Sequence, residues 1–128
     1  MLRFFYVACG GLLGAVLRYS LAAFVDKFWS IEFPFATLLI NLLGSFLIGL
    51  LYGCLEFFVI SHNMQLLLFV GILGSFTTYS TFALDNFHIL RSGDYGALFL
   101  NVILSVVLGL GLVFLGLASS RFLINIFK

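Results

Sequence analysis

The stretch that decides the fold of this chain is Phe35–Val59, which reads FATLLINLLGSFLIGLLYGCLEFFV. It carries no charged residue before Glu56. A helix needs about 20 predominantly apolar residues to cross the hydrocarbon core of a bilayer, and this stretch is long enough to do so. We therefore predict that it forms a transmembrane helix.

Similar apolar stretches lie on both sides of it. Together they predict four spans, at Phe4–Val25, Phe35–Val59, Leu66–Leu90 and Tyr95–Leu123. Hydrophobic residues make up 63% of the 128 residues and charged residues 9%, against about 45–50% and about 25% in an average soluble domain. We expect an all-α integral membrane protein, a single four-helix transmembrane domain over residues 1–128.

Lysine and arginine are evenly divided between the two sides of the predicted bundle. Four spans put both termini on one side, so that Arg3, Arg121 and Lys128 face that side while Arg18, Lys27 and Arg91 face the other. Because Lys/Arg bias sets orientation, an even division leaves little preference for either direction. One interpretation is a single orientation set by a subtler factor such as the timing of insertion. We favour dual topology, in which oppositely inserted copies pair as an antiparallel homodimer.

Small and polar residues recur every four residues along the second span. Asn41, Ser45, Gly49 and Gly53 share one helical face by this spacing. Gly10 and Gly14 in the first span, and Ser105 and Gly109 in the fourth, repeat the spacing. In lipid, such faces let helix backbones approach closely and associate by packing.

Two asparagines, Asn41 and Asn101, lie inside predicted spans. An amide in hydrocarbon is costly unless it is hydrogen-bonded. One interpretation is an interhelical hydrogen bond that holds the bundle together. We favour donors that face a wet pathway, because each asparagine extends a stripe of small residues, and we place Ser105, one turn from Asn101, on the same pathway.

The third span has an unusual centre, GILGSFTTYSTF at Gly71–Phe82, with two glycines and six hydroxyl side chains. A lipid-facing continuous helix has no use for this composition, whereas non-helical backbone is tolerated at membrane depth where it lines a cavity. We predict a helix break near Gly74–Thr78. Carbonyl groups freed there can bind a cation, and the hydroxyl groups can donate to an anion.

Aromatic residues are interleaved with these hydroxyls, Phe76, Tyr79 and Phe82 at spacings of three. Such a stripe is usually packing, but the positive edge of an aromatic ring can also contact an anion. The middle of each predicted span has no lysine, arginine or histidine. A small, strongly hydrated anion needs its water shell replaced by many donors, and neutral donors can do this without holding the ion too tightly.

These features resemble the family of small fluoride channels called Fluc or CrcB, over essentially the full length of the chain. The resemblance rests on GAVLRY at Gly14–Tyr19, TLLINLLG at Thr37–Gly44, and Gly71–Phe82, whose TTYSTF core is the most specific part. It implies a passive fluoride-selective channel that exports fluoride across the bacterial plasma (inner) membrane. The implied assembly is an antiparallel homodimer with two pores, with fluoride, a second copy and lipid as partners and no nucleic acid.

The resemblance also implies a set of site residues. A sodium ion at the dimer centre would be held by main-chain oxygens of Gly74 and Thr77 from both subunits. The pore would use Asn41, Tyr79 and Phe82, with Ser80 and Thr81 in a polar track and Arg18 at an aqueous vestibule. The chain departs from the family pattern at four positions, Ala36, Ser75, Tyr79 and Asn101. Position 79 is commonly phenylalanine, and some members have a tyrosine at position 101.

Arg18 and Asp85 should both lie roughly 10 Å deep on the same side of the membrane, at about 1.5 Å of rise per residue. A charge at depth normally finds a partner or water. We hypothesise that the two side chains share the vestibule, and an ion pair between them is one form that this arrangement can take.

Other functions fit the sequence less well. A small dual-topology proton-coupled multidrug exporter needs an acidic residue deep in a span, whereas Glu56 and Asp85 lie near span ends. A scaffold protein would not require the hydroxyl cluster of the third span. We do not expect an enzyme, because the sequence contains no metal-ligand cluster, nucleophile–base pair or phosphate-binding loop.

Overall fold

The computed structural model describes residues 1–29 and 33–126. Part of the connection between the first two spans, and Lys128 of the charge count, lie outside the described residues. The helical segments in chain order are α1 (Leu2–Phe28), α2 (Phe35–Leu55), α3 (His62–Gln65), η1 (Leu66–Leu73), α4 (Gly74–Phe76), α5 (Tyr79–Ser92), α6 (Tyr95–Ile103), η2 (Leu104–Leu108) and α7 (Gly109–Ile126).

Among residues 1–29 and 33–126, four helical stretches are long and apolar enough to cross a membrane. They are Leu2–Phe28, Phe35–Leu55, His62–Ser92 and Tyr95–Ile126, which confirms the prediction of an all-helical chain with four membrane-length helices. The second helix ends at Leu55, short of the Val59 expected from hydropathy. Just beyond it the N–H groups of Phe57 and Phe58 both donate to the Cys54 carbonyl, at 3.1 and 2.9 Å, which closes one terminal turn.

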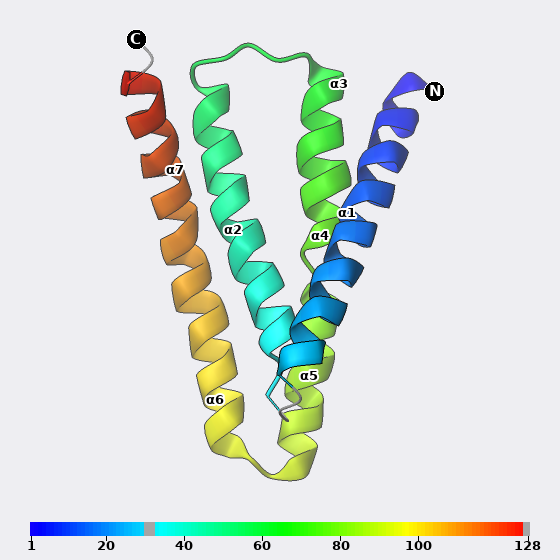
Figure 1. The fold of residues 1–128 in the computed structure, drawn as a ribbon, viewed down its shortest axis with the longest axis vertical. Coiled ribbons are helices and arrows are strands. Elements are labelled where there is room, and N and C mark those ends of the chain that lie inside the picture. Colours follow the sequence, from blue (N-terminus) through cyan, green and yellow to red (C-terminus); the bar gives the residue numbers. More distant parts are fainter. Residues whose placement is uncertain (30–32, 127–128) are drawn as a thin grey trace.

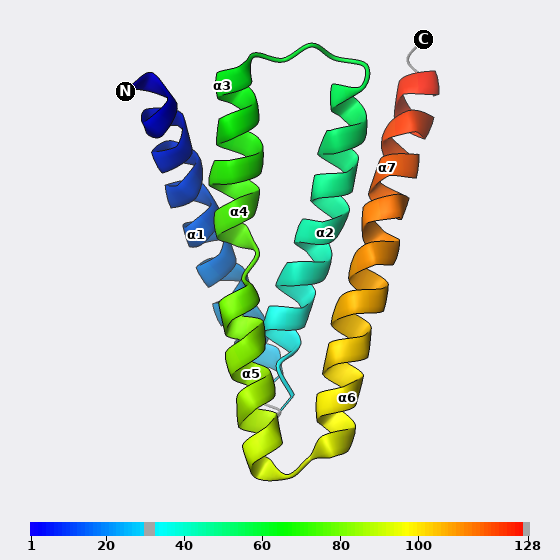
Figure 2. The same ribbon diagram turned by 180° about the vertical axis from the view of Figure 1, so that it is seen from behind.

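The helices are arranged as two packed pairs. α1 packs along η1 and α4, and α2 packs along α7. Figure 1 and its reverse view, Figure 2, show the two pairs separated at the end where both termini lie, while α2 leans across toward α1 and α5 at the other end. The contacts within each pair are therefore more extensive than those between α2 and the third helical stretch.

Glycines produce the close packing within each pair. A Cβ atom added at Gly10 or Gly14 would collide with the backbone of η1, and one added at Gly49 would collide with the backbone of α7. At Gly116 the collision would be with the backbone of α2. Because lipid tails supply no hydrophobic force between helices, this close approach is a main source of association.

Local capping fixes where the short connections begin and end. Ser61 caps α3 by accepting from the N–H of Met64 at 3.3 Å, and Asp94 caps α6 by accepting from the N–H of Ala97 at 2.9 Å. Gly93 ends α5 in the left-handed conformation, with φ 82°, which glycine adopts without a steric cost. The α5–α6 turn is thereby reduced to two residues.

Candidate functional site

The third helical stretch is interrupted at Thr77 and Thr78. α4 ends at Phe76 and α5 begins at Tyr79, and both intervening residues have extended backbone, with ψ of 150° and 115°. The side chain of Asn41 in α2 bonds to both backbone groups of Thr78. Asn41 Oδ1 accepts from the Thr78 N–H at 2.9 Å, and its Nδ2 donates to the Thr78 carbonyl at 3.3 Å.

This interruption redirects two backbone donors away from Gly74 and Thr77. In a continuous helix the Thr78 N–H would donate to the Gly74 carbonyl and the Thr81 N–H to the Thr77 carbonyl. Here the Thr78 N–H donates to Asn41, and the Thr81 N–H donates to Thr78 Oγ1 at 3.0 Å. The two carbonyl oxygens lose their usual helical partners, and oxygen atoms of this kind suit a hard cation.

Thr77 is fixed in place by both ends of its side chain. Its hydroxyl donates to the Leu73 carbonyl at 3.0 Å. Its methyl group lies where a Cβ on Gly44 would be, so α2 must carry a glycine there for Thr77 to fit. The backbone of the interruption is therefore held by α2 on one side and by the preceding turn on the other.

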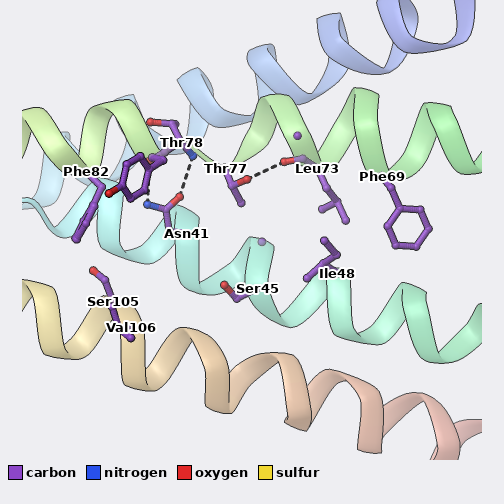
Figure 3. Close-up of a pocket in the computed structure, with 13 residues that line it drawn as sticks. Asn41, Ser45, Ile48, Phe69, Leu73, Thr77, Thr78, Phe82, Ser105 and Val106 are labelled. Carbon is purple, nitrogen blue, oxygen red and sulfur yellow. Dashed lines mark hydrogen bonds between the residues drawn. The ribbon is translucent and has the colours of Figure 1, made fainter.

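A cavity of about 400 Å³ opens beside the interruption. Figure 3 shows its walls formed by α2, by the two halves of the third helical stretch and by η2. The lining residues that carry polar side chains are Asn41, Ser45, Thr77, Thr78, Tyr79 and Ser105. None of the residues that line it carries a formal charge, so an ion in this cavity would be held by neutral dipoles.

Two aromatic rings stand at one end of this cavity. The ring centroids of Tyr79 and Phe82 are 5.9 Å apart, with the ring planes inclined by 43°. Tyr79 is 82% exposed in the single chain. The rings are tilted rather than stacked, which leaves ring edges available to an anion.

Asn101 does not face this cavity. It is 1% exposed, and its Nδ2 donates to Asn86 Oδ1 in α5 at 3.0 Å. The preference for a wet pathway is therefore wrong for Asn101, which makes the interhelical hydrogen bond instead, because Asn86 on the facing helix supplies an acceptor. Asn41 lines the cavity, but its amide is bonded to Thr78, so it too forms an interhelical hydrogen bond.

A second cavity, of about 600 Å³, lies between α1, α5 and the start of α2. Asp26, Asp85 and His88 line it together with Thr37 and Thr81. It contains apolar walls as well, from Trp29, Phe33, Phe35 and Ile89.

The hypothesised Arg18–Asp85 ion pair is wrong. Within the described ranges 1–29 and 33–126 the one ion pair joins Arg121 to Glu56, at 3.2 Å, and Asp85 Oδ2 is buried without a hydrogen-bond partner. The reason is helix packing: α1 packs on η1 and α4, before the interruption, whereas Asp85 lies beyond it in α5. Ala22, one turn after Arg18, is the first α1 residue that lines the cavity with Asp85.

The structure thus brings most of the candidate residues together. Asn41, Gly74, Thr77, Tyr79, Phe82 and Ser105 line the first cavity, and Thr81 lines the second. Ser80 is exposed and Arg18 half-buried, and neither lines either cavity.

Sequence reasoning missed two features of the site. Asn86, which holds Asn101, was overlooked although it is one of few amides within the spans. The π-helical segments η1 and η2 were also missed; η1 supplies Phe69 and Leu73 to the first cavity, and η2 supplies Ser105 and Val106. π-Helical turns are rare and frequently lie at functional sites, but their hydrogen-bond register leaves no mark in hydropathy.

Several known proteins that share one name are similar to this chain over most of its length. A protein of Parabacteroides distasonis named "Fluoride-specific ion channel FluC" is 38% identical over 128 residues, the full length of both chains. Proteins with the same name from Shewanella frigidimarina and Shewanella baltica are 46% and 43% identical over 110 residues, 86% of this chain and 89% of theirs. The family model described as CrcB-like protein, Camphor Resistance (CrcB), matches residues 5–117. The chain belongs to the CrcB family.

Proposed function

We propose that this chain is a passive, fluoride-selective ion channel that exports fluoride across the bacterial plasma membrane. The observation that carries the proposal is the uncharged, hydroxyl-lined cavity beside the interruption of the third helical stretch. Relatives that match most of the chain are named as fluoride-specific channels. Fluoride is small and strongly hydrated, so its water shell must be replaced by several donors at once, as ion filters require.

The functional unit is an antiparallel homodimer with two pores. Three residues that line the first cavity, Ile48, Tyr79 and Val106, are exposed in the single chain, Tyr79 by 82%. Lipid can cover these side chains but cannot form the wall of a pathway for a hydrated anion, so the cavity needs a protein wall on this side, and a second copy inserted in the opposite direction supplies it. The even division of Lys and Arg between the two sides, with Lys128 counted from the sequence, permits both orientations.

The fluoride pathway runs from the first cavity past the edges of the Tyr79 and Phe82 rings to the second cavity. Ser105 donates to the ion in the first cavity, and Thr81 in the second. Ser80 joins this polar track once the second copy is in place, and Arg18 faces the aqueous vestibule. Asn41 contributes mainly by fixing the Thr78 backbone, since both ends of its amide are engaged there.

A sodium ion at the dimer centre fits the residues present. The interruption turns the Thr78 and Thr81 N–H groups away from the Gly74 and Thr77 carbonyls, and oxygen ligands are the ones that hard cations prefer. Main-chain oxygens of Gly74 and Thr77 from the two copies would hold the ion, which would supply a fixed positive charge that joins the subunits at the point where each span is broken.

The test is a flux measurement on purified protein reconstituted in liposomes loaded with potassium fluoride and potassium chloride. Fluoride and chloride electrodes follow both ions, with and without the potassium carrier valinomycin. We expect fast fluoride release with little chloride release, and only after valinomycin allows potassium to follow. Fluoride release that depends on a proton gradient would instead indicate coupled transport. No release of either ion from folded, inserted protein would refute the channel.

Dual topology needs a separate measurement. A single cysteine at Ser92, in a chain whose Cys9 and Cys54 are replaced by alanine, is labelled in intact cells with a membrane-impermeant maleimide. We expect labelling of about half of the molecules, because copies inserted both ways expose this position on opposite sides. Complete labelling or no labelling would indicate a single orientation.

A further inference from the structure

α5 and α6 form a hairpin whose two helices are joined by a pair of asparagines. The helices meet at the turn of Gly93 and Asp94, and Figure 1 and Figure 2 show the two chain segments moving apart with distance from this turn. Asn101 Nδ2 in α6 donates to Asn86 Oδ1 in α5 at 3.0 Å. Within residues 1–29 and 33–126, this is the one hydrogen bond between side chains of the two helices. The asparagine pair therefore holds the hairpin together part-way along its length.

The first cavity opens one turn beyond the asparagine pair on both sides of the hairpin. Phe82 lines it from α5, one turn before Asn86, and Ser105 lines it from η2, one turn after Asn101. Figure 3 shows Phe82 and Ser105 on opposite walls at the same end of the cavity. Asn86 Nδ2 also donates to the Phe82 carbonyl at 2.8 Å. The separation of the two walls at this end therefore depends on the asparagine pair.

The amide of Asn101 is not placed there for stability alone. Because Asn86 Nδ2 is engaged by the Phe82 carbonyl, Asn86 presents Oδ1 to Asn101, and Asn101 must answer with its Nδ2. Asn101 Oδ1 is then left buried without a hydrogen-bond partner within the described ranges, in a residue that is 1% exposed. An unpaired buried acceptor lowers stability. An apolar residue at position 101 would avoid this cost, so the amide calls for a second role.

We propose that the Asn86–Asn101 pair determines which size of anion passes, by holding the two walls of the first cavity at a fixed separation. The inference rests on the proposed fluoride channel. Neither asparagine is among the described residues that line the cavity, and those that do carry no formal charge. Fluoride and chloride carry the same charge, so neutral walls separate them by size and by how many donors reach the ion. Walls held close together fit fluoride, and walls released from the pair also admit the larger chloride.

The test is the ratio of fluoride to chloride release in the liposome assay, at a protein density that gives measurable chloride release by wild type. The variants are Asn101→Leu, Asn86→Leu and the two combined. Loss of folded protein lowers both rates alike and leaves their ratio unchanged, whereas a wider cavity lowers the ratio. We expect each single variant to lower it by about fivefold, the factor that one net hydrogen bond is worth. The combined variant should lower it no further, because all three lack the same bond.

Ser120→Ala is the matched control for the loss of a buried polar side chain. Ser120 is 0% exposed, its hydroxyl donates to the Leu117 carbonyl at 2.7 Å, and it lines neither cavity. We expect this variant to keep the wild-type ratio. If Asn101→Leu does not fold, Asn101→Ala takes its place and is read by the same criteria.

Three outcomes would overturn the inference while wild type still releases fluoride. They are a wild-type ratio in folded Asn101→Leu, a combined variant in which the two single effects multiply, and an equal fall in the ratio in Ser120→Ala. Absence of fluoride release by wild type would instead refute the proposed function, and the inference with it.

Discussion

Gly71 and Gly74, three residues apart in the third helical stretch, have opposite surroundings. A Cβ added at Gly71 would lie 2.8 Å from Gly10 Cα and 3.0 Å from the Val7 carbonyl oxygen, so that α1 and η1 fit together only without it. A Cβ added at Gly74 would meet only the Phe69 carbonyl oxygen, at 3.5 Å, an ordinary contact. Gly71 is buried and Gly74 exposed. One glycine is required by packing inside the subunit, and the other has no such requirement within a single chain.

The largest expected effect is on folding, from Gly71→Ala. The added methyl group pushes against backbone atoms of α1 that cannot move independently, and overpacking of this kind costs about 1–3 kcal/mol or more. We expect loss of most folded protein in size-exclusion chromatography and a lower unfolding temperature for the remainder. Gly111→Ala in α7 is the control, because nothing lies within 4 Å of its added Cβ. Equal stability of the two variants would remove the distinction between packed and open glycines.

Gly74→Val should have the opposite effect to Gly71→Ala: the subunit should fold, but the dimer should be lost. The single chain has room for the side chain, so we expect a helical, folded subunit by circular dichroism. We expect loss of the dimer and of fluoride flux, because the branched side chain projects where the second copy and the sodium ion are proposed to meet. The measurement is oligomeric state by light scattering in detergent, together with flux. A dimer with wild-type flux would show that Gly74 does not lie at the interface.

Asn41→Asp tests the link between α2 and the interruption. The carboxylate still accepts from the Thr78 N–H but cannot donate to the Thr78 carbonyl, and its charge repels an anion strongly in a low-dielectric site. We expect fluoride release to slow by about 100-fold, since charged-group losses amount to roughly 1.5–3 kcal/mol. Asn41→Leu, which removes both hydrogen bonds without adding charge, separates the two causes. Flux that is higher in Asn41→Asp than in Asn41→Leu would exclude charge repulsion.

The sequence predicted the helices better than it predicted the partners of their polar residues. Hydropathy was sufficient for four membrane-length helices, because only lipid can accommodate so much apolar surface. The spacing of Asn41, Ser45, Gly49 and Gly53 identified one face of α2. It did not show that one half of this face lines the cavity and the other half packs against α7. Asn41 and Ser45 line the cavity, while added Cβ atoms at Gly49 and Gly53 would collide with α7.

The incorrect expectations share a physical cause. Asn101 pairs with Asn86 and Arg18 does not pair with Asp85 because of how the helices rotate and cross, which spacing along one chain does not determine. The asparagine pair joins residues 15 apart in sequence, and the Asn41–Thr78 bonds join residues 37 apart. The pattern of residues along one span shows which residues share a face of that helix. Which other helix the face contacts is decided by the packing of glycines against the backbone of that neighbour.

Phe82→Ile should have a moderate effect on flux and little effect on the fold. Phe82 is half-buried at the cavity, and isoleucine keeps its apolar surface but loses the positive ring edge. We expect fluoride release to slow by about tenfold with an unchanged dimer and unfolding temperature. Leu84→Ile, an exposed neighbour in the same helix that lines neither cavity, should leave flux unchanged. Equal rates in the two variants would indicate that the ring edge makes no contact with the ion.

The smallest expected effect comes from the far end of the α2–α7 pair, with Glu56→Gln. Arg121 Nη2 contacts Glu56 Oε2 at 3.2 Å, and the two side chains are 55% and 39% exposed. An ion pair this open to solvent is worth about 0–1 kcal/mol, far less than the glycine packing between the same two helices. We expect an unfolding temperature within a few degrees of wild type and unchanged fluoride flux. A large loss of stability would mean that the ion pair, and not the contact of Gly49 and Gly116 with the opposing backbone, holds these helices together.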